Sequence, residues 1–181
     1  ISDADGAVDT ATLTVQVNGA SEVPPPVSTT GGGANDTLAG GIGAETMLGG
    51  AGNDLMSGGL GADVFAWRLA DRAAPGAPAV DTITDFSVAP RAAGGDVLDL
   101  RDLLQGENSS PGSLDNYLHF RVEGGATIVD ISSSGGFAAG YSAAAVDQQI
   151  VLAGVDLSAG GLTTDQLIIQ DLLNRNKLIT D

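Results

Sequence analysis

Four nonapeptides follow one another without a gap between residues 31 and 66, and they constrain the fold more than any other part of the chain. They read GGGANDTLA, GGIGAETML, GGAGNDLMS and GGLGADVFA. Each opens with two glycines and carries an acidic residue at its sixth position and a large apolar residue at its eighth. A flexible glycine-rich linker has no reason to keep an acid and an apolar residue in phase. The repeat therefore predicts a solenoid of short, parallel strands.

Each position of the repeat has a physical role. Glycine permits positive φ and a close approach of neighbouring turns, so the turn carbonyls can face an ion. The three residues centred on the apolar position form a very short strand whose middle side chain points inward. The inward-pointing residues of the four units are expected to be Leu38, Met47, Met56 and Phe65.

The acidic positions predict calcium binding. If two units complete one turn, the acids that face each other are eighteen residues apart, Asp36 with Asp54 and Glu45 with Asp63. Calcium takes six to eight oxygen ligands, mostly carboxylates and carbonyls. Two carboxylates ~4 Å apart repel by about 4 kcal/mol at an effective dielectric constant of ~20, so without a cation the roll should come apart.

The predicted calcium-binding residues combine these acids with residues of the turns. They are Gly31, Gly33, Asp36, Gly40, Ile42, Glu45, Gly49, Gly50, Ala51, Gly52, Asp54, Gly58, Gly59, Gly61 and Asp63. Two positions depart from the pattern, since Ala34 replaces a glycine and Glu45 replaces an aspartate. The side that holds Asp36 and Asp54 is therefore favoured over the side that holds Glu45 and Asp63.

Composition narrows the class of protein. The chain has 181 residues, 43% of them hydrophobic, which is enough for a real core. A net charge of −16 with seven basic residues argues against a nucleic-acid or anionic-membrane partner. There are no cysteines, which excludes disulfides and thiolate metal sites. No stretch is long enough to insert into a membrane, and the start has neither an initiating methionine nor a signal peptide, as expected of a fragment of a longer protein.

The rest of the chain divides into four further segments. Residues 1–20 include an alternating strand at 11–17, and Asp3, Asp5 and Asp9 there form either a solvated loop or a calcium site at a domain junction. Residues 21–30 are a Pro-rich linker, and residues 31–67 are the β-roll. Residues 68–160 form a β capping domain, and residues 161–181 hold a helix at 165–173, capped by Thr164 or Asp165, and a short final strand. Strands of the capping domain are expected at 79–86, 94–100, 117–122, 127–131 and 148–152. The fold class is thus all-β, with a short parallel β-roll followed by an antiparallel, sandwich-like capping domain and a short C-terminal helix.

These segments together resemble the carboxy-terminal region of repeats-in-toxin (RTX) proteins, in particular the large RTX adhesins of Gram-negative bacteria. Besides the nonapeptides, the resemblance rests on GADVFAW at 61–67, DTITDF at 81–86, GDVLDLRDLL at 95–104, YLHF at 117–120, QQIVLAGVDL at 148–157 and DQLIIQDLLNRNKL at 165–178. It implies a C-terminal type I secretion signal, a transporter that reads it while the chain is unfolded, and folding by calcium at the cell surface or in the medium. It also implies upstream adhesin domains as partners and a monomeric state.

The resemblance gives the acids after the roll a role. Asp81 and Asp85 could complete calcium sites at its open end, with structural acids on a solvated strand as an equally weighted alternative. Asp96 and Asp99 are less favoured for that role.

No enzyme motif is found. The chain has neither an HExxH zinc pair nor a G-x-S-x-G elbow, and its single histidine, His119, is expected on the polar face of a strand. We therefore expect no catalytic activity. The main hypothesis is a calcium-dependent folding and secretion module of an adhesin. The alternatives are the accessory β-roll of a secreted protease or lipase, and a direct binding head for ice, sugar or another cell.

Overall fold

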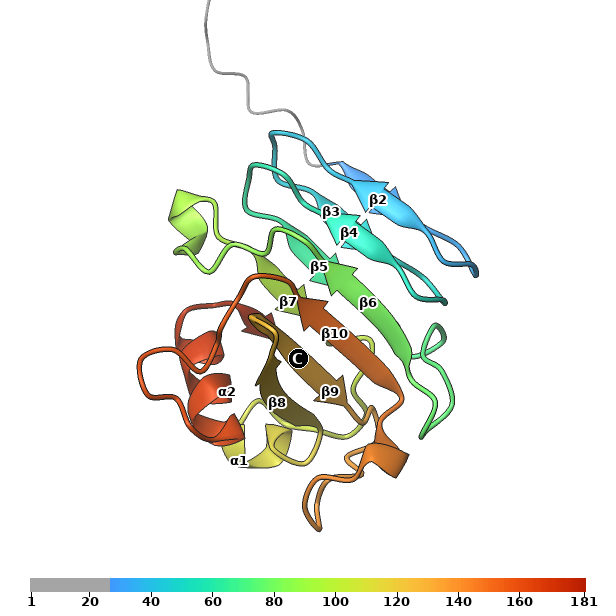
Figure 1. Cartoon of the computed structure of the whole chain (residues 1–181), viewed down its shortest axis with the longest axis vertical. Helices are drawn as coiled ribbons and strands as arrows, with labels where there is room; N and C mark the ends of the chain where they lie inside the picture. The colour runs from blue at the N-terminus through green and yellow to red at the C-terminus, as the bar shows by residue number, and fades with distance from the viewer. Residues whose placement is uncertain (1–26) are drawn as a thin grey trace, which may run out of the picture.

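Two β-sheets face each other across a single core in the computed structural model, which describes residues 27–181 (Figure 1). One sheet has five strands in the order β1-β3-β5-β7-β11, and the other has six in the order β2-β4-β6-β10-β9-β8. The strands are β1 Ser28–Thr30, β2 Thr37–Ala39, β3 Thr46–Leu48, β4 Leu55–Ser57, β5 Val64–Ala66, β6 Ala79–Ile83, β7 Val97–Asp99, β8 Leu118–Glu123, β9 Ala126–Ile131, β10 Gln148–Leu152 and β11 Leu178–Ile179. The predictions for residues 1–20, including those for Asp3, Asp5 and Asp9, lie outside the described residues.

The nonapeptides form a parallel β-roll, as predicted. Successive strands alternate between the two sheets, and each pairs in parallel with the strand two places later, for example Met47 with Phe65. The middle residue of each three-residue strand points inward, and Met47, Met56 and Phe65 are fully buried. Leu38 is half-buried because its strand lies at the end of the roll. The stacked apolar residues therefore form the thin core that the repeat predicts.

The roll begins earlier than the sequence indicates. Ser28–Thr30, placed in the Pro-rich linker above, form β1 and pair in parallel with Thr46–Leu48. This part of the linker assignment is wrong. The segment STT carries no large apolar residue, so its place in the roll comes from backbone pairing with β3 rather than from an apolar pattern.

Both sheets continue without interruption past residue 67. β6 pairs in parallel with β4, and β7 pairs in parallel with β5, so two further strands extend the roll. β10 then adds to β6 in parallel, and β11 adds to β7 in parallel. The antiparallel part consists of β8, β9 and β10. The predicted boundary between roll and capping domain thus lies within two continuous sheets.

Two α-helices lie beside the capping strands, α1 Pro111–Leu114 and α2 Asp165–Asn174 (Figure 1). The hydroxyl of Thr164 accepts a hydrogen bond from the Leu167 amide at 3.3 Å and caps α2, which is one of the two predicted caps. Ile168, Ile169 and Leu172 of α2 are buried and join the same core as the strands. Short 3₁₀ turns occur at Arg91–Ala93 and Ala143–Ala145. Within residues 27–181, no helix has the length and apolar character needed to cross a bilayer.

Candidate calcium sites

The acidic residues of the roll form two columns, one along each edge. In the first, the Asp36 amide donates to Oδ1 of Asp54 at 2.8 Å, and the Asp54 amide donates to Oδ1 of Asp81 at 2.8 Å. Each carboxylate therefore accepts the backbone amide of the acid one turn earlier. This arrangement brings together the two acids that the eighteen-residue spacing places opposite each other.

The second column repeats this geometry. The Glu45 amide donates to Oδ1 of Asp63 at 2.8 Å, and the Asp63 amide donates to Oδ1 of Asp96 at 3.0 Å. The two edges therefore match closely, although the sequence favoured the Asp36 and Asp54 side. Ala34 is tolerated in its turn because its φ is not positive. Asn176 is the only non-glycine residue with positive φ in the described part of the chain.

The second carboxylate oxygens separate the four units into two kinds. In the first two units this oxygen accepts an amide of its own loop, from Gly32 to Asp36 Oδ2 at 2.6 Å and from Gly41 to Glu45 Oε2 at 3.0 Å. Asp54 Oδ2 and Asp63 Oδ2 are buried and have no hydrogen-bond partner among the described residues. A buried oxygen without a partner costs free energy, so these two atoms are the positions where a cation is most needed.

Burial also changes the proton affinity of the column. It raises the pKa of Asp63 from 3.8 to about 6, and the hydrogen bond from the Glu45 amide opposes this rise. The neighbouring carboxylates of Asp96, Glu45 and Asp85 add to it. Without a cation, Asp63 is therefore held in a site that disfavours its charged form.

The glycines of the third unit show how closely the turns approach. A Cβ on Gly49 would lie 2.2 Å from Asp54 Oδ2, and a Cβ on Gly50 would lie 2.1 Å from the carbonyl oxygen of Gly32. Gly50 also has a φ of +97°, which disfavours other residues. The Asp54 carboxylate can therefore lie against Gly49, and the carbonyl of the adjacent turn against Gly50, only because these positions are glycine.

The site must be completed by main-chain oxygens. Among residues 27–181, no three acidic or histidine side chains converge closely enough to hold a metal by themselves. Hard oxygen ligands from one or two carboxylates and several turn carbonyls are what calcium prefers. The residues therefore fit calcium, and Asp54 and Asp63 are the side chains that could hold it. Ile42 is 73% exposed and, like Gly33 and Ala51, could contribute only its carbonyl.

The structure places every predicted site residue of the nonapeptides in the turns or at the strand entrances of the two edges. The first edge holds Gly31, Gly33, Asp36, Gly49, Gly50, Ala51, Gly52 and Asp54, and the second holds Gly40, Ile42, Glu45, Gly58, Gly59, Gly61 and Asp63.

Asp81 ends the first column without a need for a cation. Its Oδ1 accepts the Asp54 amide, and its Oδ2 accepts the Trp67 indole Nε1 at 2.7 Å and the Gln148 side-chain amide at 2.9 Å. Burial raises the pKa of Asp81 to about 6 against these hydrogen bonds. This pattern explains why acids and apolar residues share one face of β6: Asp81 and Ile83 are both fully buried.

Asp85 lies outside the column. Its carboxylate accepts the Gly58 amide at 3.0 Å, the Gly59 amide at 2.9 Å and the Ser57 hydroxyl at 2.6 Å. It thus fixes the start of the fourth nonapeptide from the exposed side. Asp99 is also outside the column, since it forms an ion pair with Arg101 at 2.6 Å.

Asp96 is the column member that the sequence analysis did not favour as a calcium-binding residue. A signal for it exists in the sequence, because all four nonapeptides place a large apolar residue two positions after the acid. The same acid-x-apolar spacing recurs at Asp81 with Ile83 and at Asp96 with Leu98. The backbone register confirms this relationship, since Met56 pairs with Ile83 and Phe65 pairs with Leu98.

Residues 30–65 match the family model of the RTX calcium-binding nonapeptide repeat in four copies. The chain carries an RTX β-roll. The chain is similar to the solution structure of the AlgE6R3 subunit from the Azotobacter vinelandii mannuronan C5-epimerase, with 27% identity and a TM-score of 0.50 over 75% of this chain and 69% of that one. The AlgE6R2 subunit of the same epimerase also matches, with 22% identity and a TM-score of 0.34 over 74% of this chain and 86% of that one. No curated protein matches the chain.

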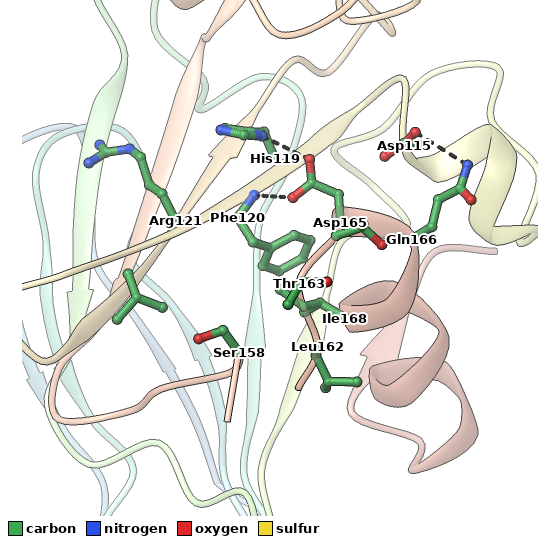
Figure 2. Close-up of a pocket in the computed structure, with 12 residues that line it drawn as sticks. Asp115, His119, Phe120, Arg121, Ser158, Leu162, Thr163, Asp165, Gln166 and Ile168 are labelled. Carbon is green, nitrogen blue, oxygen red and sulfur yellow. Dashed lines mark hydrogen bonds and ion pairs between the residues drawn. The ribbon is translucent and has the colours of Figure 1, made fainter. Parts of the chain in front are cut away.

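A cavity of about 550 Å³ lies beside the edge strand β8 and the start of α2 (Figure 2). Asp165 binds the strand there, since its Oδ1 accepts the Phe120 amide at 2.8 Å and its Oδ2 lies 2.8 Å from His119 Nδ1. The hydroxyl of Ser158, on the wall of this cavity, donates to Asp156 at 2.6 Å. The His119 and Asp165 pair therefore attaches α2 to an otherwise free sheet edge, which protects that edge from other strands.

Proposed function

We propose that this chain is a calcium-dependent folding module that is exported by type I secretion and folds outside the cell. The observation that carries the proposal is the pair of buried, unpartnered oxygens, Asp54 Oδ2 and Asp63 Oδ2, within turns that contain the RTX repeat. A calcium ion would supply the positive charge that these oxygens lack. Because a site of this kind is absent from an unfolded chain, binding free energy becomes folding free energy.

The residues of the roll determine when it folds. Asp54 and Asp63 could hold ions together with carbonyls of the adjacent turns, and the glycines bring those carbonyls close. Loop sites tuned to extracellular calcium have dissociation constants of about 10⁻⁴ to 10⁻³ M. At the low calcium concentration of the cytosol, the carboxylates within each column repel one another and the roll stays open. This open state suits a transporter that reads an unfolded chain. Extracellular calcium then closes the roll.

The location and the partners follow from the same proposal. RTX repeat proteins are typically secreted, which supports an extracellular or cell-surface location in a Gram-negative bacterium. The partners would be the type I transporter during export and the upstream domains of the host protein. The net charge of −16 supports a module that is monomeric, binds no nucleic acid and does not insert into membranes.

The host protein is proposed to be a large adhesin, in which the module would serve cell adhesion and biofilm formation. A second candidate is an accessory module of a secreted enzyme, because the similar AlgE6R3 structure is a subunit of an epimerase. In both cases the module itself is proposed to be non-catalytic. The Ser158 hydroxyl near His119 supports this view, since it donates to Asp156.

Export can be tested separately from folding. Deletion of residues 165–181 removes α2 and β11, whereas Ile169→Asp puts a charge into the core and keeps the rest of the segment. If an unfolded signal is read, a reporter fused to the I169D chain is exported and the reporter fused to the deletion is retained. Export of the deletion would contradict a signal in this segment. Surface retention of the full-length host would favour the adhesin, and release into the medium would favour the enzyme.

A further inference from the structure

The loop from Thr84 to Asp96 is the last turn of the second acidic edge. It connects β6 to β7, and β7 pairs with β5 as β5 pairs with β3. Its final residue, Asp96, takes the column position that Glu45 and Asp63 take in the nonapeptides. The loop therefore continues the edge, although its sequence is not a nonapeptide.

Basic side chains gather at this loop. The chain has only seven basic residues. Arg91 belongs to the loop, the Arg175 guanidinium donates to the Val88 carbonyl, and Lys177 Nζ donates to the Ser87 carbonyl at 3.1 Å. In the nonapeptide turns, the Gly32 and Gly41 carbonyls accept amides of the next turn, whereas here the Val88 and Ser87 carbonyls accept hydrogen bonds from protein cations.

Lys177 is the only lysine of the chain and is 1% exposed. Its ammonium lies among main-chain oxygens, because a Cβ on Gly95 would lie 2.0 Å from Lys177 Nζ and 1.7 Å from the Ala89 carbonyl oxygen. Burial lowers the pKa of Lys177, and the Asp96 carboxylate opposes that change. A buried ammonium is costly unless a negative charge and hydrogen-bond acceptors surround it, and this loop supplies both.

The two edges thus end differently. On the first edge, neutral donors from Trp67 and Gln148 bind Asp81. On the second, Asp96 accepts the Asp63 amide at 3.0 Å and the Ser87 amide at 2.7 Å, and the positive charge comes from Lys177.

We propose that the Lys177 ammonium is a built-in cation that closes the second acidic edge of the roll. This inference rests on the proposed function, in which the same edge binds calcium one turn earlier. Lys177 comes from the end of the chain: its carbonyl accepts the Leu98 amide at 2.9 Å, and the next residue, Leu178, pairs with Leu98. Docking of the C-terminal strand therefore delivers the charge, which couples that strand to the roll.

The absence of cysteine allows a test that changes the charge and keeps the side-chain length. Lys177→Cys is alkylated in urea with 2-bromoethylamine, which restores an ammonium, or with iodoacetamide, which gives a neutral side chain. Both proteins are refolded in saturating calcium. We expect the neutral adduct to melt more than about 5 °C below the wild type and the ammonium adduct to recover most of that loss.

Two results would overturn the inference. One is a neutral adduct with the melting temperature of the wild type, and the other is a pair of adducts that share one melting temperature below that of the wild type. Arg68→Cys, at an exposed position, is the matched control, and its two adducts should melt alike. The proposed function is tested apart from this, by whether the wild-type roll gains structure on calcium addition. A roll that responds to calcium together with two equal Lys177 adducts would refute the built-in cation alone.

Discussion

The backbone amide of Asp54 donates to Oδ1 of Asp81 at 2.8 Å, so the third nonapeptide is hydrogen-bonded to a residue outside the repeats. On the second edge, the Asp63 amide donates to Oδ1 of Asp96 in the same way. The roll therefore ends in side chains of the capping region. Its calcium chemistry and the folding of that region are parts of one structure.

Asp54→Asn should have opposite effects with and without calcium. Asparagine keeps an oxygen that can accept the Asp36 amide and removes the buried, unpartnered charge. In excess chelator the variant should retain more secondary structure than the wild type. Its calcium midpoint should rise about tenfold, because one charged ligand is lost. Circular dichroism during a calcium titration measures both, and the exposed Asp102→Asn is the control that should change neither.

Calcium-free protein should gain structure as pH falls. Asp63 and Asp81 have pKa values of about 6 in the folded chain against an ordinary value of 3.8. A raised folded-state pKa means that the folded state binds protons more tightly, so its stability decreases as pH rises from about 4 through about 6. Ellipticity in EDTA should therefore be greater at pH 5 than at pH 7.5. Equal ellipticity at both values would contradict the burial of these carboxylates.

Truncation of a side chain in the apolar stack should lower the free energy of unfolding most at the buried centre of the stack. Phe65→Ala removes a fully buried ring and should lower the free energy of unfolding in calcium by about 3–5 kcal/mol. Leu38→Ala, at the half-buried end of the roll, should cost less than about 2 kcal/mol. Urea unfolding of both variants gives the comparison. Similar losses would mean that the end strand is covered as well as the centre.

Trp67→Phe should weaken the structure but leave the number of bound calcium ions unchanged. It removes the 2.7 Å hydrogen bond from Nε1 to Asp81 Oδ2, while Gln148 still donates to that oxygen. The free energy of unfolding should fall by about 1–3 kcal/mol. Because Trp67 is the only tryptophan, circular dichroism must replace fluorescence. A smaller number of bound calcium ions in the variant would instead make Asp81 a ligand.

Local patterns in the sequence predict the roll well. The phase of the acids and apolar residues gives the inward-facing stack and the opposed acids, and the alternation at Gln148–Leu152 gives β10 with its correct bounds. The hairpin of β8 and β9 and helix α2 are also recovered to within a few residues. These features depend on short-range periodicity, which a single sequence displays.

What the sequence does not show depends on contacts between distant segments. β1 has no apolar pattern and forms by pairing with β3. Asp96 lies 33 residues after Asp63, not 18, so the loop before it hides its place in the column. Lys177 is a single charge near the end of the chain, and only the pairing of β11 with β7 brings it to the Ser87 carbonyl.

The most direct test is amide hydrogen exchange of the wild-type chain in excess chelator and in calcium, with magnesium as the control ion. We predict that the amides of β2 to β5 become protected only in calcium, with a midpoint between about 10⁻⁴ and 10⁻³ M. Equal protection of these strands in chelator and in calcium would contradict a calcium-dependent roll.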